Sequence, residues 1–175
     1  MDILSYKLGK NSGGGGGGGT TTDDCYWGTE ITGEPSIYNY IKRVINMDIS
    51  NRDSIAFFFN LCPNLIEVKN LNTTGVTNFR AAFYNCGQLT TVDMFDTSSG
   101  TNFEKMFGVC YFLTDASLDN ILQMLASATN YTGTKTFAYV FELNSTVGNR
   151  YYPASRLQAL PHYQDFIDAG WTIGY

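Results

Sequence analysis

The sequence is poor in charged residues. Asp, Glu, Lys and Arg make up only 15% of its 175 residues, and the formal net charge is −5. The longest basic run is Lys42-Arg43, which is too short to neutralise a nucleic-acid backbone, so we expect no nucleic-acid partner. The aromatic content of 15% is too high for a chain that is disordered throughout, and the length suits one compact domain.

Long apolar runs and a leader-like start are also missing. No run of about 18 apolar residues occurs, so the sequence predicts no membrane insertion. Residues 1–10 have no basic segment followed by an apolar stretch, so we expect no secretory signal peptide. These features favour a protein that is made in the bacterial cytoplasm and leaves it only by another route, such as lysis that releases virus particles.

Residues typical of catalytic and metal sites are sparse. His162 is the only histidine and no C-x-x-C motif occurs, so the sequence predicts no metal site and no cofactor. Because His162 follows Pro161, we interpret it as a surface or helix-capping residue rather than part of a nucleophilic site. Acid pairs such as Asp93 and Asp96 do not differ from ordinary turn acids, so we expect no enzyme activity.

A 24-residue period is the main pattern in the chain. Cys62, Cys86 and Cys110 lie 24 residues apart. Four further columns share this spacing: Ile55, Phe79 and Phe103; Phe59, Phe83 and Phe107; Leu65, Leu89 and Leu113; and Val68, Val92 and Ala116. Equivalent positions of a repeat stack on one another and form a continuous core, so we expect the three cysteines to be free, buried core residues.

This period predicts an α/β fold, a short leucine-rich-repeat solenoid with a helical C-terminal cap and a flexible Gly-rich N-terminal tether. Apolar residues four apart predict short helical or 3₁₀ segments over Thr77–Phe83 and Thr101–Phe107. The stretches Leu65–Val68 and Leu89–Val92 suit short parallel strands. Residues 72–75 and 96–100 have the composition of turns.

Two segments resemble known proteins. The run Phe83-Tyr84-Asn85-Cys86-Gly87-Gln88-Leu89-Thr90-Thr91-Val92, followed by Phe95-Asp96-Thr97-Ser98, resembles the BspA-like leucine-rich repeat. The usual form of that repeat has a Met-Phe pair before the cysteine. The first unit departs from it, because Phe58-Phe59 stands in that place. From Asn120 onward the sequence resembles the C-terminal cap of short repeat proteins encoded by phages and prophages of gut bacteria. The second resemblance implies a viral particle protein.

The chain divides into five segments. They are an anchor peptide (1–12), a Gly/Thr-rich linker (13–24), an N-terminal cap with a half repeat (25–52), the repeats (53–116) and a C-terminal cap (117–175). In the cap we expect a helix over Ser117–Leu125 with Ser117 or Asp119 as N-cap, a strand or extended segment over Phe137–Leu143, helical structure over Pro153–Ala169 that restarts at Pro161, and a closing strand over Trp171–Tyr175. Tyr151-Tyr152 is interpreted as cap packing, with exposed glycan or protein contact as the alternative.

The tether is the best sequence clue to function. A short peptide, seven glycines and a folded domain form the layout of an anchor with a displayed head, and the start resembles adaptor peptides of phage structural proteins. The anchor residues are Ile3, Leu4, Tyr6 and Leu8, whose partial alternation suits strand addition to another protein. A tail without a role is the alternative.

We therefore predict a non-enzymatic structural or accessory protein of a bacteriophage virion, located on the head or tail in multiple copies. Residues 1–12 would bind other virion proteins, and the domain would bind a host cell-surface protein or a glycan. The candidate contact residues, expected to point outward between the Leu and Val columns, are Glu67, Lys69, Thr91, Asp93 and Asp115. The alternative is a BspA-like adhesin at the bacterial cell surface or a secreted interaction protein.

Overall fold

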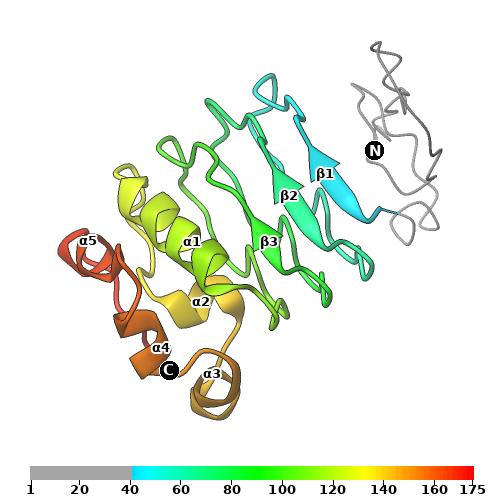
Figure 1. Ribbon diagram of the computed structural model, residues 1–175. Coiled ribbons are helices and arrows are strands. Elements are labelled where there is room, and N and C mark those ends of the chain that lie inside the picture. Colours follow the sequence, from blue (N-terminus) through cyan, green and yellow to red (C-terminus); the bar gives the residue numbers. More distant parts are fainter. Residues whose placement is uncertain (1–40) are drawn as a thin grey trace.

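The computed structural model describes residues 41–175. Its strands are β1 (Arg43–Ile45), β2 (Glu67–Lys69) and β3 (Thr91–Val92). Its helices are α1 (Asp115–Ser127), α2 (Phe137–Phe141), α3 (Ser145–Tyr151), α4 (Ala154–Gln158) and α5 (Tyr163–Asp168). The strands form a small sheet, and the helices gather beyond its β3 edge (Figure 1). The anchor peptide, the linker and residues 25–40 of the N-terminal cap lie outside the described residues.

The three strands form one parallel sheet in the order β1-β2-β3. Val44 pairs with Val68 and Val68 pairs with Val92, so neighbouring strands are offset by 24 residues. Each of these valines is buried. Successive side chains in a strand point to opposite faces, so the residues on either side of each valine point away from the core. One face of the sheet therefore covers the core, and the other carries the flanking side chains.

The predicted leucine-rich-repeat solenoid is wrong. The described part of the chain has a three-stranded parallel sheet and five short helices, which is a small mixed α/β domain. The sheet ends at β3 because the chain enters α1 at Asp115, where the 24-residue spacing calls for a fourth strand. Ala116 is consequently exposed and does not extend the column of Val68 and Val92. The prediction also erred in its helical segments.

The segments predicted as helical or 3₁₀, over Thr77–Phe83 and Thr101–Phe107, are chains of turns. The Ala82 and Tyr84 amides donate to the carbonyls three residues earlier, of Phe79 and Ala81, and Ala81 has a φ of 51°. A left-handed residue interrupts the repeating right-handed geometry that a helix requires. We call the 24-residue segments 43–66, 67–90 and 91–114, which are offset by one strand each, coils. The Ala81 amide donates to the Glu104 carbonyl of the next coil at 2.8 Å. Bonds between coils thus replace bonds along a helix.

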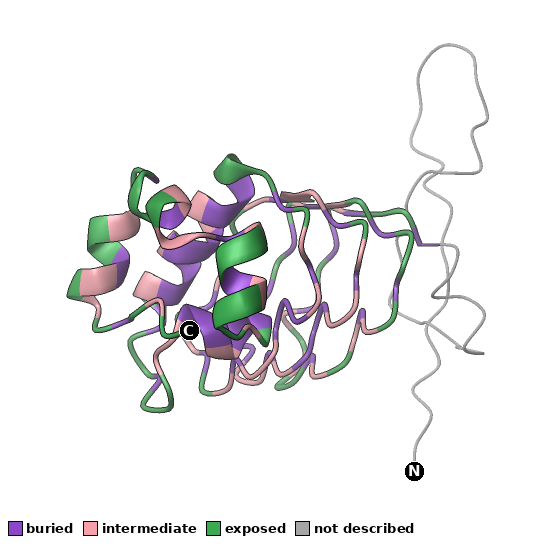
Figure 2. Ribbon diagram, turned by 90° about the horizontal axis from the view of Figure 1, so that it is seen from below, coloured by how far each residue is buried: buried purple, intermediate pink, exposed green. Residues whose placement is uncertain are grey.

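Aromatic and sulfur side chains fill the space beneath the sheet. The Phe83 ring stacks between those of Phe59 and Phe107, with centroids 5.2 and 5.3 Å apart. Cys62, Cys86 and Cys110 are free and completely buried, and the Cys110 thiol donates to the Phe83 carbonyl at 3.1 Å. Buried residues line the inside of the coils and the inner faces of the helices (Figure 2). The core is continuous from the coils into the helical region.

The helical region differs from its predicted form in three places. Thr114 is the N-cap of α1, since its side chain accepts from the Ser117 amide, so neither Ser117 nor Asp119 has that role. Phe137–Leu143 contains the helix α2 instead of an extended segment. The closing strand over Trp171–Tyr175 is reduced to one bridge, between Thr136 and Thr172. In each case tertiary contacts outweigh local propensity.

Helix α2 accepts hydrogen bonds from backbone amides of the last coil. The Lys105 and Phe107 amides donate to the carbonyls of Tyr139 and Val140, both at 3.1 Å. The Phe141 ring stacks on Phe107 with centroids 5.6 Å apart. Because buried amides need partners, α2 closes this end of the coils with both hydrogen bonds and apolar contact.

Candidate functional site

The outward side of the sheet carries most of the predicted contact residues. We call Arg43, Glu67, Lys69, Thr91 and Asp93 the sheet face. Glu67 pairs in register with Arg43 on one side and with Thr91 on the other. All but the exposed Arg43 are half-buried. The parallel register therefore brings side chains from three separate coils onto one surface (Figure 1).

Charges on the sheet face are paired. The Glu67 carboxylate binds the Lys69 ammonium and lies 3.5 Å from Arg43 Nε. The hydrogen bond with Glu67 raises the pKa of Lys69, and the Glu67 and Asp93 charges add to this effect. Two cations and two anions make the face neutral as a whole, and both cations lie beside the Glu67 carboxylate. Such a pattern can recognise a partner with complementary charges.

Asp115 is separate from the other four predicted contact residues. It is the first residue of α1, not a strand residue, and Arg156 Nε donates to its carboxylate at 2.7 Å. Arg156 also donates to the Leu113 carbonyl at 2.8 Å, so this pair fastens α4 to the start of α1. The structure thus brings Glu67, Lys69, Thr91 and Asp93 together. Asp115 lies apart from them and stabilises the contact between α1 and α4.

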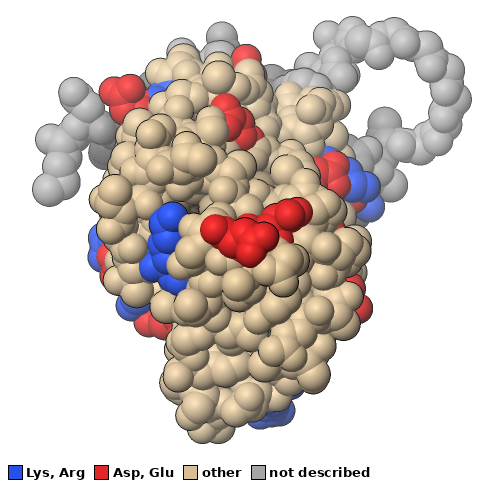
Figure 3. Space-filling view, turned by 90° about the vertical axis from the view of Figure 1, so that its left-hand side faces the viewer, with Lys and Arg blue, Asp and Glu red and all other residues tan. Residues whose placement is uncertain are grey.

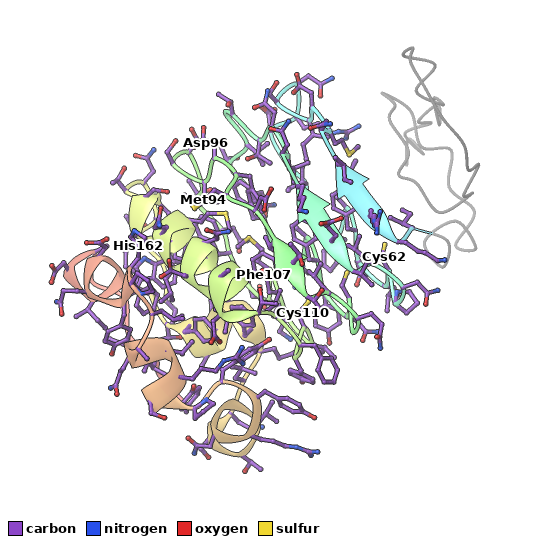
Figure 4. The ribbon with its side chains drawn as sticks, viewed as in Figure 1. Cys62, Met94, Asp96, Phe107, Cys110 and His162 are labelled. Atoms are coloured by element: carbon purple, nitrogen blue, oxygen red, sulfur yellow. The ribbon has the colours of Figure 1, made fainter. Side chains whose placement is uncertain are left out.

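Turn acids and the histidine hold structure in place. Asp96 accepts from both the amide and the hydroxyl of Ser98, which closes the turn after β3, near Met94 (Figure 4). His162 lies between α5 and α1, where Asp119 accepts from its amide at 2.8 Å and lies 2.7 Å from its Nδ1. His162 occupies the N-cap position of α5, but its side chain makes no capping hydrogen bond there and instead joins α5 to α1.

The sequence reasoning missed a groove beside α2. It has a volume of about 440 Å³, and Lys105, Tyr139, Glu142 and Asn144 contribute polar side chains to it. An extended segment over Phe137–Leu143 would have placed these groups differently, so the wrong prediction for α2 concealed the site. One available signal was Asn144-Ser145-Thr146, because Asn is a preferred helix N-cap.

Two chemical features are not found in the described region. Residues 41–175 hold no group of three or more His, Cys, Asp or Glu side chains placed to bind a metal ion. None of the helices in this region is long and apolar enough to cross a membrane. The surface on the α5 side carries few charged side chains (Figure 3).

These observations define a small α/β domain with a neutral, mixed-charge sheet face and a polar groove. No protein-family model, curated protein or solved structure matches the chain. The resemblance to BspA-like repeats and to phage-encoded proteins therefore stays a prediction based on the sequence motifs.

Proposed function

We propose that this chain is a non-enzymatic structural or accessory protein of a bacteriophage virion. Residues 1–12 attach it to other virion proteins, and the domain displays the sheet face to a protein on the host surface. The anchor pattern of Ile3, Leu4, Tyr6 and Leu8 and the seven-glycine run support attachment and display. The paired charges of the sheet face are the structural observation that supports binding.

The sheet face suits a protein partner for two physical reasons. Its side chains project from strands, and strands position side chains more precisely than loops do. Glu67 is the centre of the charge pattern, because its side chain is only 16% exposed and contacts Arg43 and Lys69. A bound partner with complementary charges can pair with Glu67, Arg43 and Lys69 in place of their pairs with one another. No charge buried by the partner is then left unpaired.

Particle incorporation tests the anchor. Purified particles from a lysate should contain the full chain when they are analysed by mass spectrometry. Replacing Ile3, Leu4, Tyr6 and Leu8 with Ser should remove the chain from particles while the purified domain stays folded by circular dichroism. A chain with a shortened glycine run is the matched control and should still be incorporated. Detection in cell envelopes but never in particles would contradict the virion proposal and favour a cell-surface protein.

Charge reversal tests the sheet face separately. Asp93→Lys should weaken binding of the purified chain to host cells about tenfold, because it places a third cation on the face. Asp53→Lys makes the same charge change at an exposed residue away from the face and should leave binding unchanged. Equal losses in both variants would show that net charge, not the sheet face, determines binding.

A further inference from the structure

The groove beside α2 presents both hydrogen-bond donors and acceptors. Lys105 Nζ donates to Glu142 Oε1 at 2.6 Å, and the two side chains are 39% and 35% exposed. They come from different parts of the chain, since Lys105 belongs to the last coil and Glu142 ends α2. Their pairing leaves the groove without net charge but with polar atoms that still reach solvent.

Asn144 adds an oriented donor. Its Oδ1 accepts from the amides of Thr146 and Val147 at 3.0 and 3.1 Å, which caps α3. Because the oxygen is held by the helix, the orientation of the amide group is fixed. The Nδ2 atom has no hydrogen-bond partner among the described residues, and Asn144 is exposed in the groove. It is therefore available to a ligand.

The groove contains one aromatic side chain, Tyr139, which is half-buried. Two further tyrosines, which do not line the groove, respond to its carboxylate. Hydrogen bonding to the Glu142 carboxylate raises the pKa of Tyr84, and the pKa of Tyr111 is raised by burial and then by the Glu142 charge. The ring available to a ligand in the groove is therefore that of Tyr139.

A separate group of aromatic rings lies outside the lining of the groove. The rings of Tyr111 and Tyr151 stack with centroids 4.5 Å apart, and Phe112 packs edge-on against Tyr151. Phe112 is 57% exposed, which is unusual for a large apolar side chain that already has aromatic partners. We call Tyr111, Phe112 and Tyr151 the aromatic platform. Tyr152 is fully buried and Tyr151 is half-buried against the core, as the cap-packing interpretation predicts.

We propose that the groove binds a neutral oligosaccharide, whose hydroxyl groups bond to Glu142 and Asn144 while one sugar ring packs on Tyr139. A sugar has an apolar C–H face and a rim of hydroxyls that both donate and accept, and this combination matches rings beside fixed polar groups. The site is distinct from the sheet face, so it does not depend on the virion proposal.

Charge and polarity argue against other ligand classes. An anion would meet the Glu142 carboxylate and a cation would meet the Lys105 ammonium, so neither sign of charge is favoured. An apolar ligand would remove the exposed parts of this ion pair from water without replacing their hydrogen bonds. A neutral, hydroxyl-rich ligand avoids both costs.

A glycan array with the purified full chain tests the proposal, using neutral and acidic oligosaccharides as probes. We expect binding to neutral members, followed by a calorimetric measurement on the best one. Asn144→Asp keeps a good helix cap but replaces the free donor with an acceptor, so affinity should fall about tenfold without loss of thermal stability. Tyr139→Ala should weaken binding by about the same factor, because it removes the ring.

The controls separate the groove from general effects. Asn51→Asp makes the same chemical change as Asn144→Asp at an exposed residue of the first coil and should leave affinity unchanged. Tyr151→Ala removes a ring of the aromatic platform, which does not line the groove, and should leave affinity unchanged. Binding to acidic glycans only, binding to none, or equal affinity in wild type and Asn144→Asp would each overturn the proposal.

Discussion

At the scale of single residues, a column of left-handed conformations is the most unusual feature of the coils. Leu61, Asn85 and Val109 are 24 residues apart and have φ values of 59°, 59° and 62°. The amides of Leu61 and Asn85 donate to the next coil at 2.8 and 2.7 Å, so this conformation keeps neighbouring coils bonded. Asn tolerates it well, whereas a β-branched residue does so at a steric cost.

The left-handed conformation of this column predicts opposite effects on stability for two substitutions. Val109→Asn should raise the free energy of unfolding by about 1 kcal/mol, and Asn85→Val should lower it by about 1 kcal/mol, because Asn adopts left-handed φ more readily. Urea denaturation measures both. Val147→Asn is the control, since Val147 is half-buried within α3 and should gain nothing. A decrease for Val109→Asn would contradict this explanation.

The residue types of a second left-handed column explain why the turns were not predicted. Phe57, Ala81 and Lys105 have φ values of 61°, 51° and 55°, yet they share no residue type that favours this conformation, so no signal marks the position. Apolar residues four apart, such as Phe79 and Phe83, favoured a helix instead. Bonds to the neighbouring coil decide between the two structures, and a local pattern carries no information about them.

At the scale of elements, α1 ends the sheet by bonding to its last strand. Ser117 Oγ accepts from the Val92 amide at 2.9 Å and donates to the Thr90 carbonyl at 3.0 Å. Asn120 Nδ2 donates to the Val92 carbonyl at 2.9 Å. Two side chains thus take the place of a fourth strand and protect an edge that would otherwise be open to pairing.

Ser117→Ala tests this edge. It leaves the buried Val92 amide without a partner, which should lower the free energy of unfolding by about 1–3 kcal/mol. Amide hydrogen exchange at Val92 should become faster. Ser155→Ala, at an exposed residue of α4, should change neither quantity. Unchanged exchange at Val92 would show that Ser117 does not protect this edge.

At the scale of the whole molecule, tyrosines whose hydroxyl groups are partly or fully removed from water link stability to high pH. Burial raises the pKa of Tyr131 and of Tyr175 to about 12, and it also raises the pKa of Tyr152. A tyrosine in the unfolded chain loses its proton near pH 10. Above that pH the unfolded chain binds fewer protons than the folded protein, so alkali favours unfolding.

We therefore expect stability to fall as the pH rises from about 10 to about 12. The urea midpoint should be lower at about pH 11 than at about pH 9. Tyr131→Phe removes one of the titrating groups, so the difference between the two pH values should become smaller. A midpoint that stays constant or rises over this range would contradict the prediction.

The sequence by itself determined which side chains lie above one another. The 24-residue spacing of Phe59, Phe83 and Phe107 corresponds to the ring stack, because equal chain lengths per coil return equivalent positions to the same place. Only the tertiary structure decided how far the sheet extends and what covers its end. Those outcomes depend on Ser117, Asn120 and α2, which meet the coils through contacts distant in sequence.

The groove, too, was decided by the tertiary structure and not by a sequence pattern. Lys105 and Glu142 are 37 residues apart, and no spacing pattern connects them. Their pairing exists because α2 is bonded to the last coil through Lys105 and Phe107 amides. The low charge that the sequence shows at once is thus a property of the whole surface, while the pairing of the few charges present is decided by tertiary contacts. Electrostatic attraction acts between neighbours in space, whatever their separation along the chain.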